Sequence, residues 1–227
     1  MIKAVIFDLD GTIVKFNIDY KTIRAEVRSF LIKNGLPASV LSTNESIFEM
    51  LEKMEIFMRN NGKTADQIEE NRRKALTIAE KYELEAAKAT SLQPGIKEVL
   101  KALKDIGLKM GICTVNSQKS ADYILERFGI KDFFTAVITR EKVKRVKPNI
   151  EHLQATLEAL KVSPKEVLVI GDSQADVKCA RELNATAVGI PTGTSTLKEL
   201  IDAGADYLIT SVTDILDLVK QINSRNA

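Results

Sequence analysis

Short apolar runs alternate with longer amphipathic segments along most of the chain. A run of apolar residues is typical of a buried strand, whereas apolar residues at every third or fourth position are typical of a helix. The runs predict strands at Ile2–Phe7, Leu108–Thr114, Ala136–Thr139, Val167–Gly171, Ala185–Ile190 and Tyr207–Ile209. The periodic segments predict helices at about 118–128, 149–160, 174–184, 196–203 and 212–223. This alternation indicates a mostly parallel sheet with helices on both faces, a doubly wound, Rossmann-like α/β fold.

Local residues predict where several helices begin and end. The segment SPKE at 163–166 has the composition of a helix start, because serine caps helices and proline suits the first turn. Glycine at positions 35 and 129 marks two helix ends, since glycine readily adopts the left-handed conformation found there.

Residues 16–90 depart from the alternation, because they contain no convincing strand and are rich in Glu, Lys, Met and Leu. Apolar residues recur there at helical spacing, beginning with the stripe from Tyr20 to Leu31. The first strand ends near Asp8 and the next begins only near Leu108, so this block is expected to be an insertion. We therefore expect a core domain of residues 1–15 and 91–227 and a small all-helical cap domain of residues 16–90.

Composition narrows the classes of function. The chain carries 33 Lys and Arg against 31 Asp and Glu, and a net charge of +2 gives no basic stripe for nucleic acid. Cys113 and Cys179 form no CxxC pair, which favours a reducing compartment without structural zinc. No apolar stretch reaches the length of a membrane span or a signal peptide. We expect a cytoplasmic protein with a small-molecule partner, acting as a monomer or homodimer.

Two further observations exclude common active sites. The chain contains neither G-x-x-x-x-G-K-[ST] nor G-x-G-x-x-G, so kinase and dehydrogenase interpretations lose their main support. The one histidine, His152, lies in a segment of helical periodicity, and a Ser-His-Asp triad or multi-histidine metal site would depend on it alone. We interpret His152 as a residue of a helix surface.

Polar side chains suited to chemistry follow four of the predicted strands. Sites in parallel sheets lie beyond the carboxyl ends of the strands. The candidates are Asp8, Asp10 and Thr12 after the first strand, Thr114 and Asn116 after the second, Lys147 beyond the third, and Asp172 and Asp176 after the fourth. Each cluster has another explanation when taken alone, because aspartate also begins turns and caps helices. Their order along the chain is more informative than any one of them.

In this order the clusters resemble the haloacid dehalogenase-like hydrolase superfamily over essentially the whole chain. The family pattern is DxDGT, then Ser or Thr, then Lys, then GDxxxD. It matches DLDGT at 8–12, Thr114, Lys147 and GDSQAD at 171–176. Similarity to phosphoglycolate phosphatase-type members lies in the segments PGIKEVLKAL, VKPN and GIPTGTSTLKELIDAGADYLITSVTDIL.

The resemblance implies roles for the four carboxylates. Asp8 resembles the nucleophile that forms an aspartyl-phosphate, and Asp10 resembles the general acid/base. A carboxylate that attacks a phosphate dianion is repelled by about 4 kcal/mol per pair of unit charges at 4 Å with an effective dielectric constant near 20, so cations are needed. Mg²⁺ would suit Asp8, the backbone carbonyl of Asp10, and Asp172, with Asp176 as a ligand or as support for one.

The remaining candidates would contact the phosphoryl group. Lys147 would bridge the nucleophile and the substrate; Lys144 is close enough to compete, but Lys147 carries the Lys-Pro pair of the family. Thr114 would hold phosphoryl oxygens, and Thr12 is a further candidate for substrate binding. Many relatives have asparagine directly after the motif threonine, whereas here Asn116 follows one place later and could reach either the phosphate or the general acid.

The resemblance implies a Mg²⁺-dependent phosphatase of small phosphorylated metabolites. A cap that excludes water favours small phosphomonoesters, with phosphoglycolate first and sugar phosphates, nucleoside monophosphates and pyrophosphate behind it. A phosphomutase of the same superfamily would use the same four clusters. A non-catalytic phosphate-sensing protein is a further alternative, although the presence of both Asp8 and Asp10 argues against it. Dehalogenase chemistry is less favoured, because that branch typically lacks the acid represented by Asp10.

Overall fold

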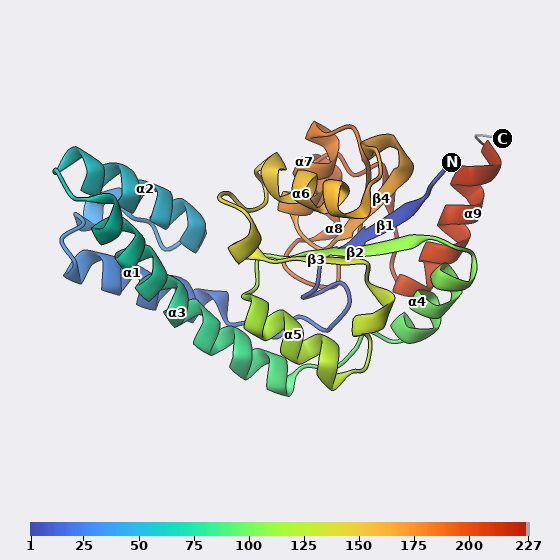
Figure 1. The fold of residues 1–227 in the computed structure, drawn as a ribbon, viewed down its shortest axis with the longest axis horizontal. Coiled ribbons are helices and arrows are strands. Elements are labelled where there is room, and N and C mark those ends of the chain that lie inside the picture. Colours follow the sequence, from blue (N-terminus) through green and yellow to red (C-terminus); the bar gives the residue numbers. More distant parts are fainter. Residues whose placement is uncertain (226–227) are drawn as a thin grey trace. The chain divides into compact units, whose positions relative to one another are not determined.

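A single parallel sheet of six strands is found in residues 1–225, the part of the chain that the computed structural model describes. The strands are β1 (Ala4–Phe7), β2 (Lys109–Cys113), β3 (Ala136–Ile138), β4 (Val167–Gly171), β5 (Thr186–Gly189) and β6 (Tyr207–Leu208). Their order is β3-β2-β1-β4-β5-β6, and every pairing is parallel. Figure 1 labels β1 to β4. The predicted parallel sheet is confirmed.

Two apolar cores lie on opposite faces of this sheet. In β1, Val5 and Phe7 belong to one cluster of buried side chains, and Ala4 and Ile6 belong to the other. The first cluster includes residues of α4 (Ile96–Asp105), α5 (Gln118–Arg127) and α9 (Ile215–Arg225), and the second includes residues of α6 (Ile150–Leu160), α7 (Gln174–Glu182) and α8 (Leu197–Asp202). A strand covered on both faces needs apolar residues at every position, because its side chains alternate between the faces. The fold is therefore doubly wound.

The direction of strand addition reverses beside β1. The chain passes from β1 to β2 and β3 on one side, and then to β4, β5 and β6 on the other. Phe7 is in register with Ile112 of β2 and with Ile170 of β4. The loops after these three strands therefore leave the same edge of the sheet at the same level, where open α/β sheets form their binding crevice.

The contacts within the chain separate two compact units, residues 1–17 with 87–227 and residues 18–86. The second unit is built from α1 (Tyr20–Lys33), α2 (Ile47–Asn60) and most of α3 (Ala65–Ala89), and no strand occurs in residues 18–86, all of which are described. In α1 the buried residues are Ile23, Val27 and Leu31, which share one face of the helix. No helix in residues 1–225 is both long and apolar enough to cross a membrane. The action of this unit as a cap stays a prediction.

One predicted helix start forms only a single turn. Pro164–Glu166 is a short 3₁₀ helix, and the Ser163 amide donates to the Glu166 carboxylate at 3.0 Å. β4 begins directly afterwards at Val167. The capping box of Ser163 and Glu166 is present, but the apolar run that follows is buried in the sheet as β4, so tertiary packing outweighs the local preference for a longer helix.

Candidate active site

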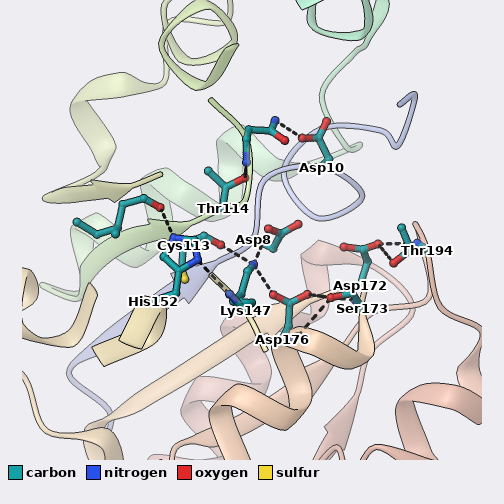
Figure 2. Close-up of polar contacts among 12 residues, drawn as sticks. Asp8, Asp10, Cys113, Thr114, Lys147, His152, Asp172, Ser173, Asp176 and Thr194 are labelled. Atoms are coloured by element: carbon teal, nitrogen blue, oxygen red, sulfur yellow. Dashed lines mark hydrogen bonds and ion pairs between the residues drawn. The ribbon is translucent and has the colours of Figure 1, made fainter. Parts of the chain in front are cut away.

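Charged side chains from several loops meet at the carboxyl edge of the sheet (Figure 2). Asp8 follows β1, Lys147 lies between β3 and α6, Asp172 follows β4, and Asp176 lies in the first turn of α7. Each of the four is less than a tenth exposed. Charged groups are seldom buried this deeply unless they are paired or bind an ion.

The ammonium group of Lys147 lies at the centre of this group. Its Nζ donates to Asp8 Oδ1 at 2.8 Å, to Asp176 Oδ1 at 2.5 Å and to the carbonyl oxygen of Cys113 at 2.6 Å. Three acceptors match the three donors of an ammonium group. Burial disfavours the charged form, but Asp176 and Asp8 outweigh it and hold the pKa of Lys147 well above its usual value. The lysine is therefore a fixed positive charge at neutral pH.

Asp8, Asp172 and Asp176 form a compact acidic cluster. One carboxylate oxygen from each lies within 4.8 Å of the others. Burial, opposed by Lys147 and reinforced by Asp176, raises the pKa of Asp8 from 3.8 to about 6. Burial and the neighbouring carboxylates of Asp8 and Asp176 also raise the pKa of Asp172 well above its usual value. One ammonium group does not balance three carboxylates.

This imbalance fits a divalent cation. Mg²⁺ binds hard oxygen donors, commonly one or two carboxylates together with water and substrate oxygens. The cluster offers such donors in a buried space that already resists carrying three negative charges, as the raised pKa of Asp8 indicates. A cation of charge +2 would offset the two negative charges that remain after Lys147 is counted.

The side chain of Asp10 is not part of the three-carboxylate cluster. The side-chain Nδ2 group of Asn116 donates to Asp10 Oδ2, and the backbone amide of Asn116 donates to Thr114 Oγ1 at 3.2 Å. Asn116 therefore reaches the residue considered as general acid, one of the two partners left open by the sequence. The loop after β2 thus joins Thr114 to Asp10 through a single residue.

Thr12 and Thr114 are both buried, but their hydroxyl groups differ. The hydroxyl oxygen of Thr114 accepts a hydrogen bond from the Asn116 backbone amide. Thr114 donates its amide to the Ile138 carbonyl at 3.0 Å, which fixes the end of β2 against β3. The hydroxyl oxygen of Thr12 has no hydrogen-bond partner among the described residues. The predicted contact of Thr12 with substrate stays a prediction.

Asp176 is held through both carboxylate oxygens. Its Oδ1 accepts from Lys147, and its Oδ2 accepts from the Ser173 hydroxyl at 2.5 Å and the Ser173 amide at 3.2 Å. The Ser173 hydroxyl also caps α7 by accepting from the Asp176 amide. A Cβ on Gly171 would lie 2.2 Å from the Asp176 carboxyl carbon. The glycine therefore makes room for this carboxylate.

The loop after β5 holds Asp172 in place. The sequence pattern did not identify this loop as part of the site. The Thr194 amide donates to Asp172 Oδ2 at 2.6 Å, and the Thr194 hydroxyl donates to the same oxygen at 3.1 Å. A Cβ on Gly193 would lie 1.9 Å from that oxygen, and one on Gly11 would lie 2.8 Å from it. The position of Gly193 and Thr194 after a predicted strand was the available signal, but threonine and glycine are also common in ordinary turns.

Arg140 is a second residue that sequence patterns missed. Its side chain is 3% exposed, and its Nη1 donates to the Val115 carbonyl at 3.2 Å. Its own amide donates to the Asn116 carbonyl at 3.4 Å. Arg140 thus fixes the backbone of the loop that carries Asn116. Nothing in the sequence separates this arginine from the neighbouring surface cations of the segment REKVKR at 140–145.

The prediction that His152 lies on a helix surface is wrong. The residue is on α6, as expected, but it is fully buried. Its Nε2 lies 3.1 Å from the Ile138 carbonyl oxygen, and its Nδ1 accepts from the Lys147 amide at 3.4 Å. α6 packs against β2 and β3, so the side that carries His152 faces the sheet. Helical periodicity alone could not show that the Ile138 carbonyl and the Lys147 amide provide hydrogen-bond partners for a buried ring at this position.

Comparisons with known proteins agree with this architecture. The sequence profile of the family described as haloacid dehalogenase-like hydrolase matches residues 5–190. A phosphoglycolate phosphatase of Chromobacterium violaceum is 26% identical over 221 residues, with 96% of this chain and 97% of the relative covered. A pyrophosphatase, PpaX, of Listeria monocytogenes is 26% identical over 223 residues, with 96% of this chain and 97% of the relative covered.

Solved structures show the same fold. The crystal structure of a hydrolase from Pseudomonas syringae superimposes with a TM-score of 0.68 at 25% identity, with 97% of this chain and 99% of that chain covered.

Proposed function

The chain belongs to the haloacid dehalogenase-like hydrolase family and is an enzyme of its phosphatase type, and on this premise we propose that it hydrolyses small phosphomonoesters through an aspartyl-phosphate on Asp8. The observation that carries the proposal is the contact between Lys147 Nζ and Asp8 Oδ1 at 2.8 Å, within the buried acidic cluster. It places a fixed positive charge beside the one carboxylate that would attack phosphorus.

Asp8 would act as the nucleophile. One of its oxygens would bond to phosphorus while the bond between phosphorus and the ester oxygen breaks, and the electron pair of that bond would leave with the alkoxide. Without compensation the repulsion between Asp8 and a phosphate dianion would be about 4 kcal/mol per pair of unit charges at 4 Å, at an effective dielectric constant near 20. Lys147 supports attack by placing its ammonium group against Asp8.

Asp10 would act as the general acid and then as the general base. It would give a proton to the departing alkoxide, and would later accept one from the water that attacks phosphorus and releases Asp8. The hydrogen bond from Asn116 to Asp10 supports this role, because it restricts the rotation of the carboxyl group. The Asp10 side chain lies outside the acidic cluster of Asp8, Asp172 and Asp176.

The acidic cluster would hold Mg²⁺ through Asp8 and Asp172. The backbone carbonyl of Asp10 would be a further ligand, as the family resemblance implies. When bound, the ion would neutralise charge on the phosphoryl group and on the attacking carboxylate. The two oxygens of Asp176 accept from Lys147 and Ser173, so this residue would act either as a ligand or as support for one.

The relatives indicate the substrate class. One relative is named a phosphoglycolate phosphatase and another a pyrophosphatase, so phosphoglycolate and pyrophosphate are the first compounds to assay. Sugar phosphates and nucleoside monophosphates follow. Thr114 and the backbone amides around it would hold the phosphoryl oxygens common to all of these compounds.

The test is a panel of these phosphate compounds assayed with and without Mg²⁺, using the wild type, Asp8→Asn and Asp105→Asn. Asp105 is exposed, so its variant makes the same chemical change away from the site and should keep wild-type turnover. Asp8→Asn should lose at least 10³-fold in kcat, as expected when a nucleophile is removed. Borohydride reduction of enzyme stopped during turnover should modify residue 8. Full turnover by Asp8→Asn would overturn the mechanism.

The same panel separates the alternatives. A phosphomutase would interconvert sugar phosphate isomers without releasing stoichiometric phosphate. A non-catalytic phosphate-sensing protein would release none from any compound.

A further inference from the structure

The imidazole ring of His152 is a fully buried titratable group that the proposed chemistry does not use. It is fully buried in the first turns of α6, five residues after Lys147. Both ring nitrogens have backbone partners, the Lys147 amide at Nδ1 and the Ile138 carbonyl at Nε2 (Figure 2). A histidine with both nitrogens occupied cannot serve as a proton acceptor for substrate.

These two contacts define one tautomer. A carbonyl oxygen only accepts hydrogen bonds, so Nε2 must carry the proton that it donates to Ile138. An amide only donates, so Nδ1 must present its lone pair to Lys147. The ring is therefore neutral and protonated on Nε2. It accepts a hydrogen bond at Nδ1 and donates one from Nε2.

The acceptor on Ile138 is shared with the loop that follows β2. Its carbonyl oxygen accepts from the Thr114 amide at 3.0 Å as well as from His152. His152 thus connects the backbone of Lys147 to the point where Thr114 leaves the sheet. Two of the four site loops are tied together through a single ring.

We propose that His152 is a positioning residue that fixes the backbone of Lys147 relative to Thr114 and so aims the ammonium group at Asp8. This inference rests on the proposed function, because it assigns Lys147 a role in phosphoryl transfer. Displacement of a reacting group by about 1 Å can cost on the order of 100-fold in rate. Because Lys147 contacts the attacking carboxylate of Asp8, a ring that sets the start of the Lys147 side chain is expected to affect kcat more than KM.

The electrostatic surroundings keep the ring in this state. Burial, together with the charge of Lys147, lowers the pKa of His152 from 6.5 to about 4, while the Ile138 carbonyl and Asp176 oppose the shift. Protonation would place a second N–H against the Lys147 amide, where two donors would face each other. The bridge is thus intact at neutral pH.

The first experiment observes the ring directly. Because His152 is the one histidine of the chain, ¹⁵N-labelled enzyme gives a single imidazole signal pair. We expect the chemical shifts of a neutral ring protonated on Nε2, unchanged between pH 8 and 6. A ring protonated on Nδ1, or one that titrates near the usual pKa of about 6.5, would overturn the proposal.

The second experiment compares His152→Phe, His152→Asn and Thr156→Val. Phenylalanine fills the space but accepts nothing, whereas the side-chain oxygen of asparagine can replace Nδ1 as acceptor for the Lys147 amide. We expect His152→Phe to lose about 10- to 100-fold in kcat with KM changed less than threefold, and His152→Asn to recover at least half of the loss on a logarithmic scale. Thr156 is buried on the same helix and donates its hydroxyl to the His152 carbonyl at 3.0 Å, so Thr156→Val should lower the melting temperature without lowering kcat.

The outcomes distinguish this inference from the proposed function. If the wild type hydrolyses no compound of the panel, or if Asp8→Asn keeps full turnover, the proposed function fails. If Lys147→Ala keeps wild-type turnover, the role of Lys147 and the positioning role of His152 both fail. If Lys147→Ala is inactive but a folded His152→Phe keeps wild-type kcat, only the positioning role fails. The same holds if the decrease in kcat of the two His152 variants is explained by their decrease in melting temperature. Should His152→Phe not fold, the tautomer of the wild-type ring and the kcat of His152→Asn decide the matter.

Discussion

At the scale of single residues, a few hydrogen-bond donors orient the closely spaced carboxylates of the site. One carboxylate oxygen of Asp8 and one of Asp176 accept hydrogen bonds from Lys147. One carboxylate oxygen of Asp172 accepts a hydrogen bond from Thr194. Hydrogen bonds to charged groups contribute about 1.5–3 kcal/mol each, enough to hold a carboxylate in one orientation. Each acidic residue is thus oriented before any cation or substrate arrives.

Asn116→Ala tests the orientation of Asp10 separately from the nucleophile. Loss of a hydrogen bond to a carboxylate should lower kcat about 10-fold for an alkyl phosphate, whose leaving group needs a proton. The loss should be smaller for p-nitrophenyl phosphate, whose leaving group needs little help. Steady-state kinetics with both esters checks this, and Val115→Ala at the neighbouring, half-buried position is the control. An equal loss on both esters would contradict a role through Asp10.

Residue types were predictable only where chemistry restricts them strongly. Asp8, Asp10 and Asp172 could be named as candidates, because they follow predicted strands and match the DxDGT and GDxxxD motifs of the family that the chain resembles. Thr194 and Arg140 could not, since a threonine in a turn and an arginine in a basic segment have ordinary explanations. The environment that distinguishes them is a carboxylate or a carbonyl far away in the sequence.

At the scale of elements, the loop 191–195 after β5 shapes the site as much as the loops that carry the acids. Thr194 bonds to Asp172, and the Thr192 hydroxyl donates to the Gly11 carbonyl in the loop after β1. The Ser195 amide donates to the Asp172 carbonyl at 3.1 Å. The loops after β1, β4 and β5 are therefore joined by hydrogen bonds beyond the sheet.

Gly193→Ala tests this loop through the metal. The added Cβ would lie 1.9 Å from Asp172 Oδ2, so the carboxylate must turn away. We expect the Mg²⁺ concentration for half-maximal activity to rise about 10- to 100-fold, as when the support of a metal ligand is lost. Activity titrated with Mg²⁺ measures this. Gly189→Ala in β5 is the control: its Cβ would meet Leu208 and Leu200 at 3.0 and 3.2 Å, so it should affect stability but leave the Mg²⁺ requirement unchanged.

At the scale of the whole molecule, the buried acidic cluster works against folding when no cation is present. Burial raises the pKa of Asp8 from 3.8 to about 6, so the folded protein holds a proton that the unfolded chain has released between these pH values. The free energy of unfolding therefore decreases as pH rises from about 4 to 6. The raised pKa of Asp172 acts in the same direction. A cation that binds the ionised cluster reverses this loss.

Scanning calorimetry with and without Mg²⁺ should show the effect. At pH 7.5, Mg²⁺ at about 100 times its Kd should stabilise the fold by about 2.7 kcal/mol, which corresponds to about 5 to 10 °C in Tm for a chain of this size. At pH 5 the gain should be smaller, because protons compete for the same oxygens. Asp172→Asn should reduce the gain at pH 7.5. An equal gain at both pH values would contradict a cation site made from these carboxylates.

The sequence by itself determined the strands, most of the helices and the order of the chemical clusters. These follow from local periodicity, because a buried strand needs apolar residues on both faces and a helix needs an apolar stripe. Only the tertiary structure decided which side chains meet. Asp8 and Lys147 are 139 residues apart, and the register of parallel strands brings their loops to one edge. The burial of His152 and the contact of Thr194 with Asp172 depend on the same packing, which no local pattern encodes.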